Sequence, residues 1–277
     1  MTIGRETAIR LGCFIGVFGA MAAWEMLAPR RPLTVGKSPR WFSNLALVAL
    51  NAILVRLVLP LSAFGTAAFA AKHGWGILNL WSAPAWLRFV IAVAALDFAI
   101  YLQHVLFHAV PALWRLHMVH HADLDFDVTT GLRFHTIEIL ISTFLKVGVV
   151  VALGSPVWAV LTFEVLLNAT SMFNHGNVRL PVWLDRLVRF VVVTPDMHRV
   201  HHSTERREAN SNFGFNLPWW DRLLGTYRSQ PAAGHEGMQI GVAHVRDEQV
   251  VERLPAMLAL PFARSGGDYP IGERETT

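Results

Sequence analysis

Five apolar segments, each of bilayer-spanning or nearly bilayer-spanning length, dominate the first 175 residues. An α-helix rises about 1.5 Å per residue, so roughly 20 apolar residues cross the hydrocarbon core. The pattern therefore predicts an all-α, polytopic membrane bundle of about four to five spans, with residues 62–84 as an external loop at the membrane interface. The five segments are residues 11–28, 41–61, 86–108, 137–153 and 157–173.

The composition agrees with a membrane protein. Hydrophobic residues make up 53% of the chain and charged residues only 16%, too few to cover a soluble protein of 277 residues. No glycine-rich phosphate loop and no basic stripe interleaved with aromatic residues is present, so a nucleic-acid partner is not expected. The single cysteine, Cys13, lies in an apolar run and excludes a disulfide framework or a thiolate metal site.

The basic residues predict the orientation. Arg30, Arg31, Lys37 and Arg40 follow the first apolar segment, and the positive-inside rule places this loop in the cytoplasm. The third and fifth spans then also end in the cytoplasm. A signal peptide cleaved after residues 20–22 is the alternative, but cleavage would leave the basic loop outside. The expected location is a bacterial inner membrane.

Two of the spans carry a polar stripe that ends in histidine. At about 100° per residue each stripe falls on one helix face. An isolated carboxylate in lipid is costly, so Asp97 should have a partner, and an imidazole N–H is the natural one. Lys146, in the fourth span, is expected to pair with Glu164 or to snorkel. The stripes are Asp97, Tyr101, His104 and His108 in the third span and Glu164, Asn168, Ser171 and His175 in the fifth.

Histidines are concentrated in two clusters. The sequence HVLFHAVPALWRLHMVHH occupies residues 104–121, and MHRVHH at residues 197–202 repeats its second half. Residues three and four apart share a helix face, so each cluster can present two or three imidazoles together. The candidate metal ligands are His104, His108, His117, His120, His121, His135, His175, His198, His201 and His202.

Imidazole ligands without thiolates point to zinc, copper, iron or nickel. Eight or more ligands exceed the needs of one ion, so two metal ions are predicted. The HExxH pattern of zinc proteases is absent. The carboxylate set of ferritin-like di-iron bundles is absent too, so the site should be rich in nitrogen.

Local signals predict further helices. The segment 182–193 alternates apolar and charged residues and suits either a helix in the interface plane or an amphipathic core helix. Thr194, Pro195 and Asp196 then form a helix start, so the second histidine cluster should open a new helix. A further helix is expected near residues 247–258, followed by a disordered tail from residue 264.

In combination, these motifs resemble the fatty acid hydroxylase and sterol desaturase superfamily of membrane di-iron enzymes. The order is HxxxH, HxxHH, RFHxxE, NH and TPxxHxxHH, and the resemblance covers roughly residues 85–228. It implies a membrane bundle whose cytoplasmic histidine cap holds two irons. These would activate O2 to hydroxylate or desaturate an unactivated C–H bond of a lipid, such as a sterol or fatty acyl chain.

The resemblance also implies the roles of single residues. The ten histidines above are carried over as metal ligands, with Glu138 as a ligand or an orienting group. Asp97, Tyr101 and Glu138 are the candidate catalytic residues. No cytochrome b5-like domain is fused, so electrons should come from a separate cytochrome b5-like or ferredoxin/reductase protein. We expect three parts: spans at 1–84, a catalytic domain at 85–228, and an appendage with its tail at 229–277.

Two other classes of function remain open at this stage. A membrane metal transporter or sensor would also place histidines on helices, although near the membrane midplane. A membrane zinc hydrolase would need an open coordination position and a general base, for which Glu138 or Glu164 is available.

Overall fold

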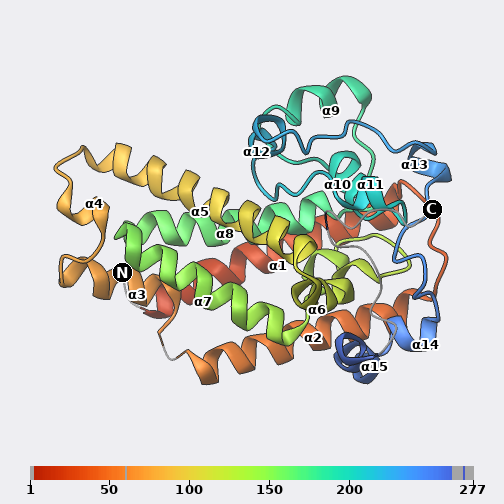
Figure 1. Ribbon diagram of the computed structural model, residues 1–277, viewed down its shortest axis with the longest axis horizontal. Coiled ribbons are helices and arrows are strands. Elements are labelled where there is room, and N and C mark those ends of the chain that lie inside the picture. The colour runs from red at the N-terminus through yellow and green to blue at the C-terminus, as the bar shows by residue number, and fades with distance from the viewer. Residues whose placement is uncertain (1–2, 60, 264–270, 272–277) are drawn as a thin grey trace.

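The long helices lie side by side and form one bundle. The computed structural model describes residues 3–59, 61–263 and 271, and this part contains helices and isolated β-bridges but no strand. The predicted all-α bundle is therefore confirmed. The long helices, shown along the horizontal axis of Figure 1, are α1 (Ile3–Leu27), α2 (Lys37–Val58), α5 (Ala85–Ala109), α7 (Thr136–Leu153) and α8 (Val157–Asn174).

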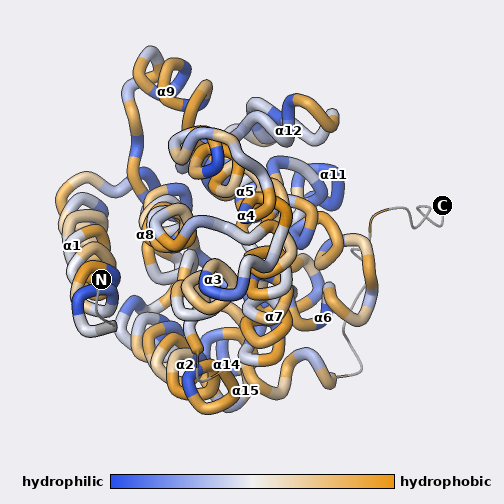
Figure 2. The backbone as a smooth tube through the Cα atoms, turned by 90° about the vertical axis from the view of Figure 1, so that its left-hand side faces the viewer, coloured by the Kyte–Doolittle hydropathy of each residue, from blue (hydrophilic) through white to orange (hydrophobic). Residues whose placement is uncertain are grey.

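Four stretches are long and apolar enough to cross a membrane: Gly4–Leu27, Lys37–Leu80, Ala85–Ala109 and Thr136–Leu153. This agrees with the prediction of four to five spans. Figure 2, which views the bundle from one end, shows the mainly hydrophobic positions along these helices. The expected fifth span is the helix α8, but it is not among the four candidates. It lies within the bundle in contact with α1, α3 and α5.

The prediction of a loop at residues 62–84 is wrong. The segment forms α3 (Ala63–Lys72) and α4 (Ile77–Leu80). The side chain of Ser62 caps α3 by accepting a hydrogen bond from the backbone N–H of Gly65 at 3.1 Å. Ala67 and Ala70 are fully buried where α3 packs on α7 and α8. The alanine-rich sequence both favours a helix and lets the helix axes approach closely.

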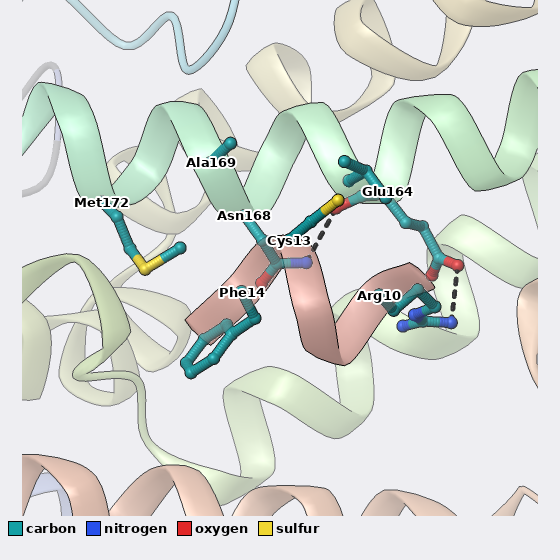
Figure 3. A pocket seen from close by; sticks show the side chains of 8 residues that line it. Arg10, Cys13, Phe14, Glu164, Asn168, Ala169 and Met172 are labelled. Atoms are coloured by element: carbon teal, nitrogen blue, oxygen red, sulfur yellow. Dashed lines mark hydrogen bonds and ion pairs between the residues drawn. The ribbon is translucent and has the colours of Figure 1, made fainter. Parts of the chain in front are cut away.

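Charged residues inside the bundle neutralise one another. Lys146 of α7 pairs with Glu164 of α8, which confirms one of its two expected roles. Figure 3 shows Arg10 of α1 facing the same carboxylate beside a small pocket between α1 and α8, and the two charged groups lie 3.0 Å apart. Glu6 pairs with Arg10 one turn away at 3.0 Å. The network therefore joins three helices and neutralises Glu164 within the bundle.

The shorter helices of the second half gather mainly at the opposite end of the bundle from α3 and α4 (Figure 1). Val182, Trp183, Leu187 and Phe190 in and after α9 are exposed, which agrees with a helix in the interface plane rather than in the core. The tail expected from residue 264 lies outside the described residues, apart from Ile271. These helices are α6 (Pro111–His121), α9 (Val182–Val188), α10 (Pro195–His201), α11 (Arg206–Ala209), α12 (Trp219–Leu223), α13 (Gly234–Gly237), α14 (Glu248–Val251) and α15 (Leu254–Ala259), with 3-10 turns at Thr130–Leu132 and Leu260–Phe262.

Candidate metal centre

Four elements bring nine histidines together at this end of the bundle. The last two turns of α5 and the helix α6, which follows after Pro111, supply the first cluster. The residue that caps the C-terminus of α8 supplies one more, and α10 with its own C-cap supplies the last three. In chain order they are His104 and His108; His117, His120 and His121; His175; and His198, His201 and His202.

The start of α10 forms as its sequence predicts. The side chain of Thr194 accepts a hydrogen bond from the backbone N–H of Met197 at 3.4 Å, and Pro195 occupies the first turn. The carboxylate of Asp196 in the same turn pairs with Arg199. This fixes where the helix begins and therefore which side of it carries the histidines.

The nine histidines divide into two groups. The ligand atoms within each group lie within 4.8 Å of one another, and every one of these side chains is buried. In each copy of the HxxHH pattern the first and last histidines belong to one group and the middle histidine belongs to the other. We call them the five-histidine group (His104, His108, His117, His121 and His201) and the four-histidine group (His120, His175, His198 and His202).

Within each group the Nε2 atoms face one another. In the five-histidine group, the Nε2 of His104 lies 3.1 Å from that of His117 and 3.0 Å from that of His201. In the four-histidine group, the Nε2 of His175 lies 3.1 Å from those of His198 and His202. Such distances bring several ring nitrogens around one point.

The protein occupies the opposite ring nitrogens of several of these histidines. The Nδ1–H groups of His104 and His201 donate to the carbonyls of Phe213 and Ser211, both at 2.7 Å. His175 donates in the same way to Ser171 at 2.8 Å, and His120 donates to Arg133 at 3.1 Å. A neutral imidazole carries one N–H, so these bonds leave each Nε2 with a bare lone pair. Lone pairs that converge at about 3 Å repel one another unless a cation lies between them.

Burial keeps these imidazoles neutral. It lowers the pKa of His117 and of His175 to about 3, and it lowers the pKa values of His120, His121 and His198 well below the usual range. Neutral imidazole is the form that binds metal. Two sets of neutral nitrogen donors fit two ions of iron, zinc, copper or nickel, which agrees with the predicted donor chemistry.

Glu138 stands behind one of the grouped histidines. Its carboxylate accepts a hydrogen bond from the Nδ1–H of His117 at 2.6 Å, and both side chains are buried. A carboxylate in this position fixes the tautomer and the ring orientation and raises the basicity of the other nitrogen. Of the two roles considered for Glu138, the geometry favours orienting a ligand over being one.

His135 lies apart from both groups, contrary to the ten-ligand prediction. It caps the N-terminus of α7, where its Nδ1 accepts a hydrogen bond from the backbone N–H of Ile137 at 3.2 Å. Its Nε2–H donates to the carbonyl of Leu258 at 3.3 Å. Both nitrogens are therefore engaged, and we leave His135 out of the ligand set that we propose below.

The prediction that Asp97 bonds to an imidazole is also wrong. Its carboxylate accepts hydrogen bonds from the side chains of Asn216 and Trp220, both at 2.7 Å, and not from an imidazole. The hydroxyl of Tyr101 lies 2.9 Å from that of Thr226. Helical periodicity is a local property and does not reveal that residues 212–226 fold back onto α5. The side chains of Asp97 and Tyr101 hold residues 212–226 in place.

The same segment contains supports that the sequence did not reveal. The buried carboxylate of Asp221 accepts the backbone N–H groups of Phe213, at 2.8 Å, and of Gly214, at 2.9 Å. Burial raises the pKa of Asp221 to about 6. These bonds set the carbonyl of Phe213 against His104. A backbone carbonyl has no side-chain signature, so the sequence could not reveal this support.

A buried ionic network holds the loop behind α6. The guanidinium of Arg133 donates to the carbonyl of Val119 at 2.8 Å and pairs with Glu252 of the C-terminal part at 2.7 Å. Arg40 of α2 pairs with Asp123 at 2.9 Å, and Arg40 and Arg133 together lower the pKa of Asp123 although burial opposes this shift. The loop that contains Arg133, whose carbonyl accepts from His120, is thus tied to α2 and to the C-terminal part of the chain.

Comparison with known proteins agrees with this geometry. Residues 89–226 match the family model of the fatty acid hydroxylase, a range that contains all nine grouped histidines. The chain is 32% identical to the ornithine lipid hydroxylase OlsE of Rhizobium tropici over 192 residues, covering 69% of this chain and 55% of that protein. No solved structure gives a significant match.

Two further relatives match shorter parts of the chain. The alkylglycerol monooxygenase of Homo sapiens is 26% identical over 62% of this chain and 36% of its own length. The cholesterol 25-hydroxylase of Mus musculus is 32% identical over 51% of this chain and 47% of its own length. The chain thus spans about half or less of the length of the relatives it matches. With its family-model match and its two histidine groups, the chain belongs to the fatty acid hydroxylase and sterol desaturase superfamily.

Proposed function

We propose that this protein is an O2-dependent di-iron hydroxylase of membrane lipids. The observation that carries the proposal is the pair of buried histidine groups, in which bare Nε2 atoms approach one another to 3.0–3.2 Å. The relatives named above are all hydroxylases or monooxygenases of lipids. Nine nitrogen donors suit two ions better than one.

Bound iron would supply the oxidising chemistry: one atom of O2 enters a C–H bond of the lipid, and the other leaves as water after the uptake of two electrons and two protons. The chain itself holds the nine imidazoles and keeps them neutral by burial. Glu138 orients His117 through its Nδ1–H. Asp97 and Tyr101 act indirectly. They anchor residues 212–226, the segment in which the carbonyl of Phe213 orients His104.

The substrate class follows from the position of the groups. His104 and His108 lie in the last two turns of α5, a candidate membrane span, so the groups sit where a span ends. A hydrocarbon chain could then reach them sideways from the bilayer. The relatives act on lipids with different polar parts (ornithine lipid, alkylglycerol and cholesterol), and what these share is hydrocarbon. We propose a lipid hydrocarbon chain as the substrate and hydroxylation as the reaction.

The setting of the enzyme forms part of the proposal. Electrons come from a separate protein, either cytochrome b5-like or a ferredoxin/reductase pair. In this proposal the protein lies in a bacterial inner membrane with its histidine groups on the cytoplasmic side. The basic residue Arg30 pairs with Asp196 of the histidine-bearing helix α10, at 3.5 Å, and the positive-inside rule favours the cytoplasm for such a basic segment. The 85–228 segment is the catalytic domain, preceded by membrane helices and followed by an appendage.

The two other classes of function gain no support. A zinc hydrolase would need a free carboxylate as general base, but Glu138 is bonded to His117 and Glu164 is paired with Lys146 and Arg10. A transporter would place its ligands near the middle of the spans, often at broken helices. Here the groups lie at helix ends, and α5 runs unbroken for 25 residues.

The proposal is tested by supplying ¹⁸O2 to cells that produce the protein and analysing their lipids by mass spectrometry. We expect one ¹⁸O atom per product, and its loss in His120→Ala and in His201→Ala, which remove one ligand from each group. His135→Ala is the matched control, because this histidine belongs to neither group, and it should still form the product. Full labelling in both ligand variants would refute the proposal.

A further inference from the structure

A second, larger pocket lies on the non-membrane part of the molecule. It encloses about 780 Å³, counting its open mouth, and is formed by segments 31–34, 124–126 and 236–240 together with Asn177 and Arg246. None of these residues belongs to the four candidate membrane spans. The pocket therefore faces water rather than lipid.

Polar groups hold the walls of this pocket. Arg31 donates a hydrogen bond to the carbonyl of Met238 at 2.8 Å, and Arg246 donates to the carbonyl of Ile240 at 2.9 Å. The carboxylate of Asp125 accepts the backbone N–H of Thr34 at 2.9 Å. The two arginines and Asp125 line the pocket, so water would fill it readily.

Phe126 lies between this pocket and the four-histidine group. It lines the pocket, and only 3% of it is exposed. The centre of its ring lies 5.0 Å from the ring of His202 and 5.4 Å from the ring of His175. On its pocket side it packs with Met238 and Ile240. One phenyl ring thus separates a water-facing pocket from histidines that are completely buried.

We infer that the pocket is the aqueous entrance to the four-histidine group and that Phe126 is its gate. The inference rests on the proposed function, which places a metal ion in this group and a reaction that takes up protons beside it. The proposed reaction takes up two protons and releases one water at a completely buried site, so a path to water is needed. Rotation of the Phe126 ring would open such a path to His175 and His202. Water, protons and small polar solutes are the species that this entrance fits.

Iron release to a water-soluble chelator measures access without measuring catalysis. The full-length protein is loaded with iron in lipid nanodiscs and mixed with bathophenanthroline disulfonate, an anionic chelator that colours on binding Fe²⁺. Phe126→Ala should release one of two iron equivalents about tenfold faster than the natural protein, a lowering of the barrier by about 1.4 kcal/mol. The other equivalent, in the five-histidine group, should leave at an unchanged rate.

Phe134→Ala is the matched control. The ring of Phe134 stacks on His120 of the same group, with centres 4.3 Å apart, but it does not line the pocket. It should leave both rates near those of the natural protein. Equal acceleration in the two variants would mean that loosened ligands, and not an opened entrance, release the metal, and would overturn the inference.

A plug tests the same entrance in the opposite direction and does not disturb the buried cluster. Gln239 is exposed and lines the pocket, so Gln239→Trp should narrow the mouth and slow the release of the same iron equivalent. This variant decides the matter if Phe126→Ala does not fold, and unchanged release from it would then refute the entrance. Failure of the proposed function looks different, because the natural protein itself would retain no iron.

Discussion

Replacing Glu138 by glutamine tests how the chain prepares a ligand. The side chain keeps its size, but the negative charge that accepts the Nδ1–H of His117 at 2.6 Å is lost. Bonds to carboxylate partners of this kind typically change metal affinity about 10- to 100-fold, or about 1.4–2.8 kcal/mol. Because Glu138 and His117 are both buried, we expect Glu138→Gln to lie toward the upper part of this range for one of the two metal ions.

The assay is a competition titration of the purified, metal-free protein with iron or zinc against a chelator of known affinity. It resolves two binding events, and only the one in the five-histidine group should weaken. Asp97→Asn is the matched control, since it also exchanges a buried carboxylate for an amide. Asp97 is bonded to Asn216 and Trp220 and reaches a histidine only indirectly, through the segment that carries the Phe213 carbonyl, so metal affinity should fall by about twofold at most, much less than in Glu138→Gln.

Two results would refute this reasoning. If Glu138→Gln binds both ions as the natural protein does, the carboxylate does not support the ligand. If Asp97→Asn weakens binding as strongly as Glu138→Gln, affinity depends on the general integrity of the bundle and not on the bond to His117.

Three further predictions concern stability and metal content. Burial lowers the pKa values of the ligand histidines outside the candidate spans, to about 3 at two of them, whereas in the unfolded chain they take up protons near pH 6.5. The free energy of unfolding of the metal-free protein should therefore be highest above pH 6.5. Below that pH it should fall toward pH 3 by about 1.4 kcal/mol per pH unit for each such histidine. A melting temperature that is constant between pH 7.5 and 5.5 would contradict this. In Gly131→Ala the added methyl group would lie 3.0 Å from the Nδ1 of His175, so elemental analysis should show the loss of one metal ion. In the control variant Gly148→Ala the added methyl group has no neighbour within 4 Å, so this variant should keep both metal ions. Lys146→Met leaves the carboxylate of Glu164 with one cation fewer and should lower the unfolding free energy by about 3 kcal/mol. The double variant Lys146→Met/Glu164→Gln should recover part of this loss. Equal melting temperatures of the single variant and the natural protein would refute the buried pair.

The sequence predicted the bundle well because apolar length and helical periodicity are local properties. The five long helices lie close to the predicted ranges, and the Thr194 cap and Pro195 start α10 as expected. The loop predicted between residues 62 and 84 failed for a different reason. Its low charge and its glycines concealed an alanine-rich helix, whose burial depends on contacts with α7 and α8 that no local pattern reveals.

For the candidate site, the sequence predicted which residues gather but not how they divide. Spacing placed His117, His120 and His121 on one helix, yet the assignment of His120 to the other group depends on where α8 and α10 lie in space. His135 matched a motif, but its position at the start of α7 turns it into a cap. Asp97 was correctly predicted to need a partner, and the partner lay more than 100 residues away along the chain.

The most direct test of the central claim is the iron content of the purified protein, measured by elemental analysis in mild detergent. Two groups of ligands predict about two iron ions per chain. Removing two ligands from one group, as in His117→Ala/His121→Ala or in His175→Ala/His198→Ala, should leave about one ion in each case. Folded natural protein with well under one ion per chain, or double variants that still hold two, would contradict the two-group account.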